Sequence, residues 1–322
     1  MPTPAVLLLT HHADYYTVDR VAEAVARRGL RAVRFDTDRF PSHARVSIRY
    51  GSADATLIAG SDDAPIESSD VRGVWLRHVW QAPRVEGLEP RFAEAAARES
   101  AMTLRGAWDA LRHARWINRP EAVAIAGDKP RQLRVAREVG LDVPRTLLTN
   151  DPGEARAFFA ECQGRVVAKM LTSLSRGMDG SAAVVYTSRV SEADLGGLDG
   201  LRYAPMLFQE EVVKSRELRV AVVRGEPFVG SLDTSRSPEV DSRKLDPDTI
   251  RWESDALPDG VARALVALHE ALGLDFGASD LIRTPEGQHV FLEINPCGEW
   301  GMLERDLGLP ISEALARGLC ED

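Results

Sequence analysis

The sequence predicts an α/β protein whose C-terminal part is α+β. Its first third alternates short apolar runs with segments of helical periodicity, a pattern typical of parallel strands joined by helices. From residue 206 onward strands dominate and follow one another closely, which predicts antiparallel pairing. The chain has 322 residues, and at roughly 150 residues per domain this length allows about two domains.

The N-terminal third begins with a βαβ unit. Residues 5–9 form an apolar run typical of a buried strand, and apolar residues then recur at helical spacing from 18 to 25. Gly29 ends this helix, and residues 31–35 follow as a second strand, which should lie parallel to the first. Further along we expect a hairpin over 45–58, a strand over 71–76 and a long amphipathic helix over 91–111.

The pattern changes at the motif WINRP, residues 116–120. We then expect helices over 129–139 and 154–162, an extended segment over 145–148, and strands over 166–170 and 182–186 around a Gly- and Ser-rich loop. The strand-rich end includes a helix over 261–272 and a last hairpin with its turn at residues 285–287. Residues 234–256 are polar and predict a mobile loop. We therefore expect three domains, over 1–117, 118–205 and 206–322.

Composition and charge exclude several classes of protein. Forty Lys and Arg against 49 Asp and Glu give a net charge of -9, which argues against a protein that binds nucleic acid or an anionic membrane surface. The three cysteines are too few and too scattered for a disulfide framework or a metal-binding motif. No segment has the roughly 20 apolar residues of a membrane span. We expect a cytoplasmic protein.

The last hairpin carries the strongest functional signal. Asp280 lies on one strand, while Glu293 and Asn295 lie two residues apart on the other and so face the same side of the sheet. Three oxygen ligands without His or Cys suit Mg²⁺. Acidic residues on a strand can also simply face solvent, but Glu293 stands among apolar neighbours, namely Phe291, Leu292 and Ile294.

Two lysines are candidates for binding phosphate groups. Lys169 lies within the apolar strand VVAKM, where an ammonium group needs an anionic partner, and the loop that follows, which contains Ser173, could place backbone N–H groups around phosphates. Lys129 begins a helix, and the N-terminal end of a helix favours anions. Either lysine alone would more often be a solvated or snorkelling side chain, and it is their combination with the acidic hairpin that favours a phosphate site.

The segment FQEEVVKSRELRV offers a further set of polar groups. Residues 209–212, Gln209, Glu210, Glu211 and Val212, close a strand and could present backbone groups to a purine edge. Glu217 could reach ribose hydroxyls, and Arg219 could face a transferring phosphate. Taken alone, the segment is an ordinary pair of charged strands.

The order of these residues resembles that of the ATP-grasp carboxylate ligases, over roughly residues 118–300. A Walker motif is absent from the sequence, which disfavours a P-loop enzyme. The N-terminal third sharpens the resemblance. Its motifs LLLTHHADYY, VWLRHVW and WINRP, with FLEINPCGEW near the end, are similar to those of the microviridin and graspetide maturases, which macrocyclise ribosomally made peptides.

The resemblance implies an ATP-grasp fold, use of ATP with two Mg²⁺ ions, and transfer of the γ-phosphate to a side-chain carboxylate of a precursor peptide. Attack by a hydroxyl or amine of the same peptide would then give an ω-ester or ω-amide. The partner would be a peptide with a leader and an acidic, hydroxyl-rich core, and the enzyme would be a homodimer. The metal ligands would be Asp280, Glu293 and Asn295. Nucleotide contacts would come from Lys129, Lys169, Ser173, Gln209, Glu210, Glu211, Val212, Glu217, Arg219 and Asn295, with Arg219 and Lys169 acting in catalysis.

An acidic peptide also needs a cationic dock. Arg77 is favoured for this role, and counted with the catalytic residues, because it closes a strand and should point into a cleft at the carboxyl edge of the sheet. Many relatives carry two arginines and a proline here, whereas this chain reads Arg77-His78-Val79-Trp80. Other candidates for the dock are Arg176, Lys214, Arg216 and Arg243. We assign no role to His11 and His12.

Three hypotheses follow. The first is an ATP- and Mg²⁺-dependent ligase that forms esters or amides within a precursor peptide. The second is an ATP-grasp ligase for free amino acids or a protein C-terminus, like glutathione synthetases or glutamate-adding enzymes. The third is a non-catalytic, nucleotide-dependent peptide-binding module. The presence of Asp280, Glu293, Asn295 and Arg219 argues against the third, because a degenerate enzyme has no need of these residues.

Overall fold

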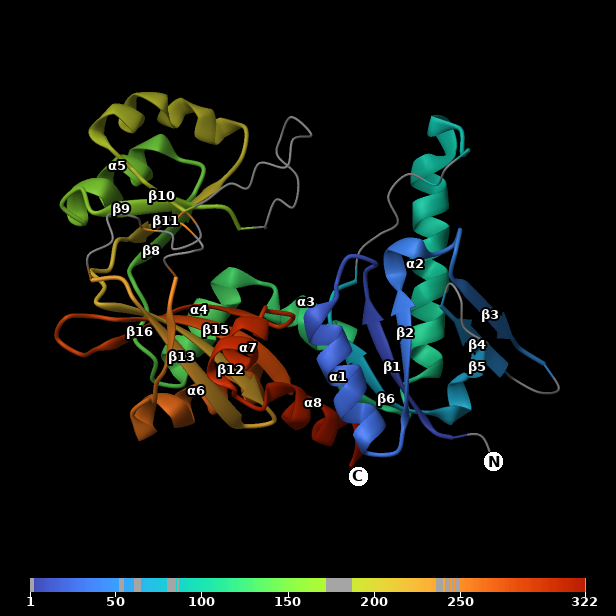
Figure 1. Ribbon diagram of the computed structural model, residues 1–322. Helices are drawn as coiled ribbons and strands as arrows, with labels where there is room; N and C mark the ends of the chain where they lie inside the picture. Colours follow the sequence, from blue (N-terminus) through green and yellow to red (C-terminus); the bar gives the residue numbers. More distant parts are fainter. Residues whose placement is uncertain are drawn as a thin grey trace.

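The computed structural model describes residues 3–51, 55–60, 65–79, 85, 87–171, 187–235, 240, 244, 246 and 250–321. The strand expected over 182–186 and the candidate residues Ser173, Arg176 and Arg243 lie outside these ranges. The described strands form four sheets (Figure 1).

The first sheet is parallel and contains the predicted βαβ unit. Its strand order is β2-β1-β6-β7, and every residue of β1 is buried, as expected for a central parallel strand covered on both faces. Gly29 follows α1 with a φ of 80°, a conformation that glycine adopts without strain. The elements are β1 (Ala5–Thr10), α1 (Tyr16–Arg27), β2 (Arg31–Asp36), β6 (Val71–Leu76) and β7 (Arg115–Ile117).

A small antiparallel sheet and a long helix stand beside this sheet (Figure 1). The predicted hairpin is confirmed, with a third short strand added to it. The elements are a 3-10 helix at Thr37–Arg39, β3 (Arg45–Arg49), β4 (Ala55–Ala59), β5 (Ile66–Glu67), 3-10 helices at Ser68–Asp70 and Pro90–Phe92, and α2 (Ala93–Ala110).

The third sheet forms a separate lobe, at the upper left of Figure 1. It is antiparallel in the order β10-β9-β11-β8 and packs against one α-helix and one 3-10 helix. The elements are α3 (Pro120–Ala126) and α4 (Lys129–Glu138), which lead into it, then β8 (Thr146–Thr149), α5 (Pro152–Glu161), β9 (Val166–Lys169), β10 (Ser188–Arg189), the 3-10 helix Glu192–Arg202 and β11 (Met206–Glu210).

The fourth sheet has five antiparallel strands in the order β14-β13-β12-β15-β16. The expected mobile loop over 234–256 is wrong in part, because residues 252–254 pair with β13 as an edge strand. The elements are β12 (Arg216–Val223), β13 (Glu226–Asp233), β14 (Trp252–Ser254), α6 (Asp259–Leu272), β15 (Phe276–Arg283), β16 (His289–Asn295), α7 (Gly301–Leu307) and α8 (Ile311–Cys320).

The C-terminal end of the chain packs against its N-terminal part. Helix α8 lies beside α1 (Figure 1), and Leu315 shares one hydrophobic core with Val6 of the first sheet and Ala221 of the fourth. The first and fourth sheets are therefore packed as one body. None of the helices in the described part of the chain has the length and apolar character needed to cross a bilayer.

Candidate nucleotide and metal site

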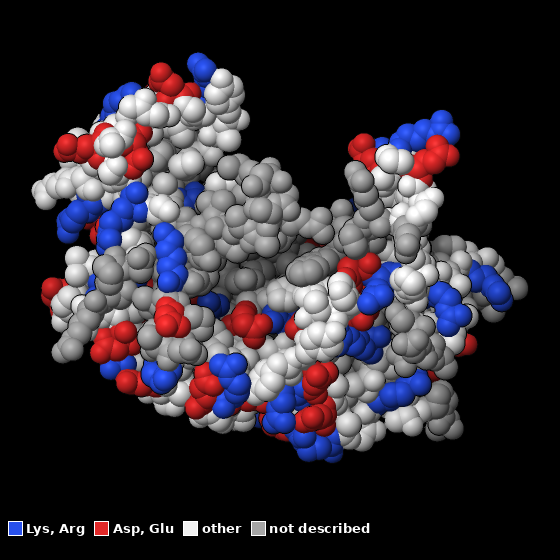
Figure 2. Space-filling model, turned by 45° about the horizontal axis from the view of Figure 1, so that its top comes forward, with Lys and Arg blue, Asp and Glu red and all other residues white. Residues whose placement is uncertain are grey.

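A cleft of about 1080 Å³ lies between the third and fourth sheets. Figure 2 shows the molecule hollowed between its lobes, with acidic and basic side chains close together inside. Most of the residues singled out in the sequence line this cleft. They are Lys169, Gln209, Glu210, Glu211, Val212, Glu217, Arg219, Asp280, Glu293 and Asn295.

The acidic hairpin has the predicted geometry. Asp280 pairs directly with Glu293 across β15 and β16, and Asn295 pairs with Ala278 two positions along. The three oxygen-bearing side chains therefore share the face of the sheet that forms the cleft wall. The register shifts immediately after Asp280, an irregularity of the kind that often re-aims side chains at functional sites.

The two carboxylates of this hairpin lie close enough for the charge of Glu293 to act on Asp280. Burial raises the pKa of Asp280 to about 6, and the neighbouring charge of Glu293 adds to the rise against the opposing charge of Arg219. The guanidinium Nε of Arg219 lies 2.9 Å from Oδ1 of Asp280. Burial would also raise the pKa of Glu293, but the ammonium group of Lys129, which contacts its carboxylate, holds that pKa below its usual value.

This donor set fits a hard divalent cation. Two facing carboxylates with an amide oxygen beside them are the ligands that Mg²⁺ prefers, and it commonly takes its remaining oxygens from phosphate and water. Burial, the largest cause of the raised pKa of Asp280, disfavours its ionised form, and the neighbouring charge of Glu293 adds to the effect. A bound cation would stabilise the ionised carboxylate.

The two lysines occupy different places. Lys169 ends β9 and lines the cleft, close enough for its charge to act on Asp280 and Glu293. Lys129 begins α4 and contacts Glu293, and it is not among the described residues that line the cleft. The phosphate contact expected for Lys129 therefore stays a prediction, whereas its contact with a proposed metal ligand was not foreseen.

The segment 209–212 is already partly bonded. The backbone N–H groups of Glu210 and Glu211 donate to carbonyl oxygens of Arg145 and Arg165, each at 2.9 Å. The Glu210 side chain also accepts from the Arg145 guanidinium, at 2.9 and 3.1 Å. Strand β11 ends at Glu210, so Val212 lies beyond the ladder on the cleft wall.

The side chains around this segment are similarly engaged. Gln209 is buried and donates to Thr146 Oγ1 at 3.0 Å. The carboxylate of Glu211 accepts from Arg189. Glu217 contacts Lys214, whose ammonium group also donates to the carbonyl of Val240 at 2.8 Å. Glu217 and Lys214 both line the cleft, where a ribose could reach them.

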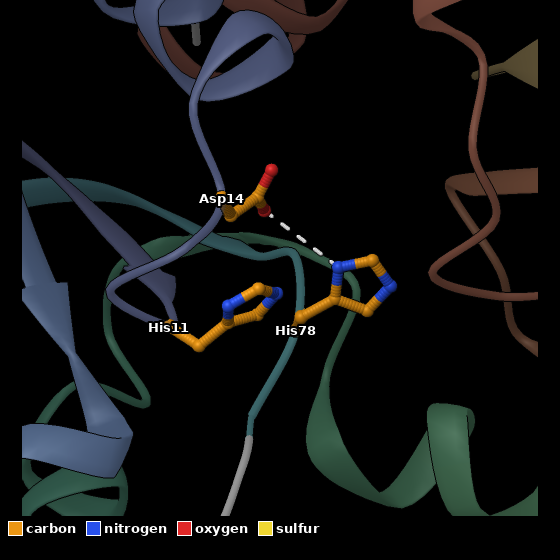
Figure 3. A group of neighbouring side chains, drawn as sticks. All are labelled: His11, Asp14 and His78. Carbon is orange, nitrogen blue, oxygen red and sulfur yellow. Dashed lines mark ion pairs between the residues drawn. The ribbon is translucent and has the colours of Figure 1, made fainter. Parts of the chain in front are cut away.

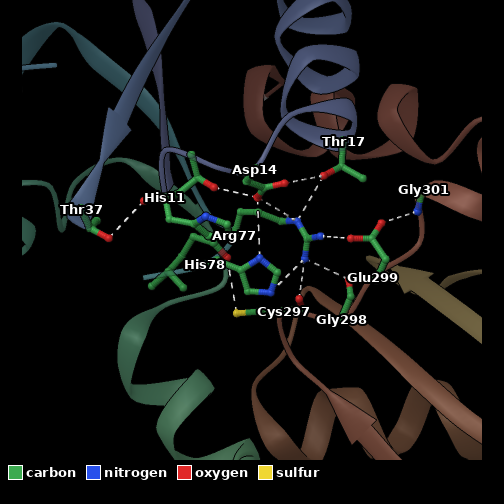
Figure 4. Close-up of polar contacts among 12 residues, drawn as sticks. His11, Asp14, Thr17, Thr37, Arg77, His78, Cys297, Gly298, Glu299 and Gly301 are labelled. Atoms are coloured by element: carbon green, nitrogen blue, oxygen red, sulfur yellow. Dashed lines mark hydrogen bonds and ion pairs between the residues drawn. The ribbon is translucent and has the colours of Figure 1, made fainter. Parts of the chain in front are cut away.

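The placement of Arg77 differs from the expected one. Its side chain is only 1% exposed and lies outside the set of residues that line the cleft. It contacts Asp14, Thr17, Cys297, Gly298 and Glu299 (Figure 4). A guanidinium with that many partners is poorly suited to dock a substrate carboxylate. Of the other candidates, Lys214 lines the cleft, while Arg216 pairs with Glu253.

Sequence reasoning missed several residues of the cleft. Asp14, Tyr16 and Thr17 line it from the start of α1, and Glu299 and Arg305 line it from the segment after β16. The signal for Asp14 was available, because loops that follow parallel strands gather at the carboxyl edge of a sheet. No local sequence signal pointed to Glu299, because the segment that carries it reaches the first sheet only through contacts between distant parts of the chain.

Three of the residues near this edge form a compact group. His11, Asp14 and His78 have ligand atoms within 4.8 Å of one another, and the rings of the two histidines lie with their centroids 5.6 Å apart and their planes tilted by 43° (Figure 3). Nε of Arg77 lies 3.6 Å from Asp14, and Nη1 of Arg77 lies 3.4 Å from Nε2 of His78. A cation therefore already occupies the edge of this group, which disfavours a metal ion there.

Comparisons with known proteins agree with this arrangement. A family model described as the MvdD pre-ATP grasp domain matches residues 5–124. The macrocyclase MdnB from Microcystis aeruginosa MRC is 44% identical, with 99% of this chain and 100% of that chain covered and a TM-score of 0.86. A RiPP-associated ATP-grasp ligase from Chryseobacterium gregarium, solved with ADP and a leader and core peptide, is 30% identical, with 99% and 97% covered and a TM-score of 0.90.

A more distant relative is a probable alpha-L-glutamate ligase from Enterobacter sp. (strain 638), 26% identical over 209 residues. That match covers 61% of this chain and 64% of the relative, so it spans slightly less than two thirds of the relative's length. The similarities to MdnB and to the Chryseobacterium ligase, by contrast, extend over almost the whole chain. This chain therefore belongs to the ATP-grasp ligases of the graspetide maturase family.

Proposed function

We propose that this ligase macrocyclises a ribosomally made precursor peptide, by joining Asp or Glu side chains to Ser, Thr or Lys side chains of the same peptide. The observation that carries the proposal is the acidic hairpin opposite Lys169 in a cleft whose whole scaffold matches a macrocyclase. A second support is the related ligase solved with ADP and a leader and core peptide.

The reaction takes place in two steps. A peptide carboxylate attacks the γ-phosphorus of ATP, the bond to the β-phosphate oxygen breaks, and ADP leaves. A hydroxyl or amine then attacks the carbonyl carbon of the acyl phosphate, loses its proton, and expels inorganic phosphate as the ester or amide forms. Phosphoryl transfer of this kind depends mainly on positioning and on neutralisation of charge.

The residues of the cleft suit these needs. When bound, Mg²⁺ neutralises charge on the phosphates, and Asp280, Glu293 and Asn295 would hold it. Lys169 lies where it would face phosphate oxygens, and Arg219 lies beside Asp280 where it would face the transferring group. We propose two ions and a homodimer on the resemblance alone, and the division of the chain at residues 117 and 205 on the change of sequence pattern at these positions together with the resemblance.

Because the protein as a whole is negatively charged, the cleft itself has to attract the anionic ligands. The protein carries -9, and both proposed ligands are anionic, so attraction has to be local. Lys169, Lys214, Arg219 and Arg305 line the cleft. Because Lys214 and Arg219 already contact carboxylates of the protein, ATP should bind weakly without a divalent cation.

The test is mass spectrometry of the precursor peptide after incubation with enzyme, ATP and Mg²⁺. The peptide is sought among short neighbouring reading frames rich in Thr and Glu. Each linkage should remove the mass of one water, and tandem fragmentation of the product should show protected ring segments. A peptide whose mass stays unchanged, under conditions where the enzyme binds ATP, would contradict the proposal.

A second candidate function is ligation of free glutamate to a protein or peptide, which the glutamate ligase relative favours. The same assay separates the two functions, because addition of glutamate increases the mass of the acceptor whereas cyclisation decreases it. If neither change occurs with any candidate peptide while nucleotide-dependent peptide binding persists, the protein is a binding module.

A further inference from the structure

Arg77 is a charged residue in an almost fully buried place. It directly follows β6, and its side chain is 1% exposed. A guanidinium withdrawn from water to this degree needs several partners. Its partners come from two parts of the chain that are more than 200 residues apart in sequence.

The first part is the start of α1. Nε of Arg77 donates to Oγ1 of Thr17 at 3.3 Å and lies 3.6 Å from Oδ2 of Asp14. Both of these partners also line the cleft. This end of Arg77 is therefore fixed to the start of α1 and to the loop that precedes it.

The second part is the segment that leaves β16. Nη1 of Arg77 donates to the carbonyl oxygens of Cys297 at 2.5 Å and Gly298 at 3.2 Å. The backbone N–H of Cys297 donates in turn to Oδ1 of Asn295 at 2.9 Å. Figure 4 shows the contacts of Arg77 with Cys297 and Gly298. A single residue, Cys297, thus joins Arg77 to Asn295, one of the proposed Mg²⁺ ligands.

Glu299 extends the same network to the cleft. One of its carboxylate oxygens contacts Arg77, and the other accepts from the N–H groups of Trp300 at 3.0 Å and Gly301 at 2.7 Å. Its side chain is 53% exposed and lines the cleft. Arg77 therefore also orients a carboxylate on the cleft wall.

The segment held by Arg77 has little room to move. A Cβ atom on Gly298 would lie 2.4 Å from Cβ of Ala278 on β15, closer than any tolerable contact. The carbonyl of Pro296 accepts from Nδ2 of Asn118 at 2.9 Å. A shift of this segment would therefore displace Asn295, because the neighbouring contacts leave the segment no room to absorb the movement.

We propose that Arg77 is a positioning residue of the ligase, which holds Asn295 and Glu299 in place from the first sheet and so sets the affinity for Mg²⁺ and nucleotide. The inference rests on the proposed function, because that function assigns Asn295 to the metal. In this proposal Arg77 does not bind the substrate carboxylate; it acts indirectly, by positioning Asn295 and Glu299.

The test compares Arg77→Met and Arg77→Lys with the matched control Arg72→Met, an exposed arginine on the strand that Arg77 follows. Calorimetric titration measures ADP binding across a series of Mg²⁺ concentrations, and thermal unfolding reports whether each variant is folded. Because loss of a group that orients a metal ligand typically costs roughly 10- to 100-fold in metal affinity, Arg77→Met should raise the half-saturating Mg²⁺ concentration by a factor in that range. Arg72→Met should leave it unchanged.

Arg77→Lys keeps the test decisive if the methionine variant fails to fold. Lysine preserves the buried positive charge beside Asp14 and Glu299, but a single ammonium group cannot also span Thr17 and the Cys297 carbonyl as the planar guanidinium does. A folded lysine variant with the Mg²⁺ dependence of the wild type overturns the inference. If instead the wild-type protein shows no Mg²⁺-dependent ADP binding, the proposed function fails.

Discussion

The carboxylate of Glu293 contacts the ammonium group of Lys129 and is also a proposed ligand of the cation in the cleft. We expect Glu293→Gln to abolish cyclisation, because a neutral amide binds Mg²⁺ poorly and leaves Lys129 without its counter-charge. The measurement is the mass of the precursor peptide after incubation with ATP and Mg²⁺. Glu286→Gln, an exposed position in the turn of the same hairpin, is the control. Full activity of Glu293→Gln would refute the metal assignment.

Arg219 lies on the neighbouring strand, with its guanidinium against Asp280. Arg219→Met should reduce kcat by roughly 100-fold, in the range found when one preorganised group that stabilises transition-state charge is removed, whereas Arg219→Lys should retain part of the activity. Initial rates of ADP release in the presence of peptide provide the measurement. Arg224→Met serves as the control, because Arg224 directly follows the same strand and lies beside Asp275, and neither residue lines the cleft. A methionine variant with the kcat of the wild type would rule out the catalytic role.

At the scale of the element, most of the fold could be predicted from local sequence patterns. The βαβ unit was predictable because helical and apolar periodicities alternate over residues 5–36, and the last hairpin because a clear turn separates two strand-like runs. The same hairpin placed Asp280, Glu293 and Asn295 on one face, because side chains alternate along a strand.

The parts that sequence could not predict depend on contacts between distant segments. Arg77 was expected at a strand end facing the cleft, but the returning segment with Glu299 covers it. Lys129 contacts Glu293, which lies 164 residues away in the sequence. The strand Trp252–Ser254 is too short and polar for local periodicity to reveal, and pairing with β13 creates it. Tertiary context decided each of these cases.

Helix α6 carries a buried histidine that links stability to pH. Burial lowers the pKa of His269, whose side chain contacts backbone carbonyls of Leu265 and Gly277. The unfolded chain takes up a proton near pH 6.5, whereas the folded chain resists protonation. This contribution to stability is therefore complete above that pH and is lost as the pH falls through it towards the lowered folded pKa.

We expect His269→Gln to lose less stability than the wild type on acidification from about pH 7.5 to about pH 5, by at most about 1.4 kcal/mol per pH unit. Urea unfolding at both pH values gives the two differences. His11 and His289 also have lowered pKa values, so only the difference between variant and wild type isolates His269. Equal losses in the two proteins would show that His269 does not contribute.

For the whole molecule, the notable feature is that the two ends of the chain form one structural unit. Core residues of the first sheet, the fourth sheet and α8 belong to a single cluster, and ion pairs join α1 to the C-terminal helices, for example Arg20 to Glu304 at 3.2 Å. Arg77 and Asn118 cross the same boundary with hydrogen bonds. A cleft with walls from both ends of the chain therefore has a rigid base.

This shared core predicts that the first and fourth sheets unfold together. Leu315 of α8 is fully buried between them, so Leu315→Ala should lower the free energy of unfolding by about 2–5 kcal/mol and shift one common transition rather than split it. Urea titrations followed by circular dichroism and by tryptophan fluorescence test this, because Trp75 lies in the first sheet and Trp300 precedes α7, both within the shared cluster. Leu148→Ala, at a leucine of β8 that is 43% exposed, is the control and should change stability little. If the two probes report separate transitions in the Leu315 variant, the sheets are independent units, and the rigid link between Arg77 and the metal-binding strand would lose its structural basis.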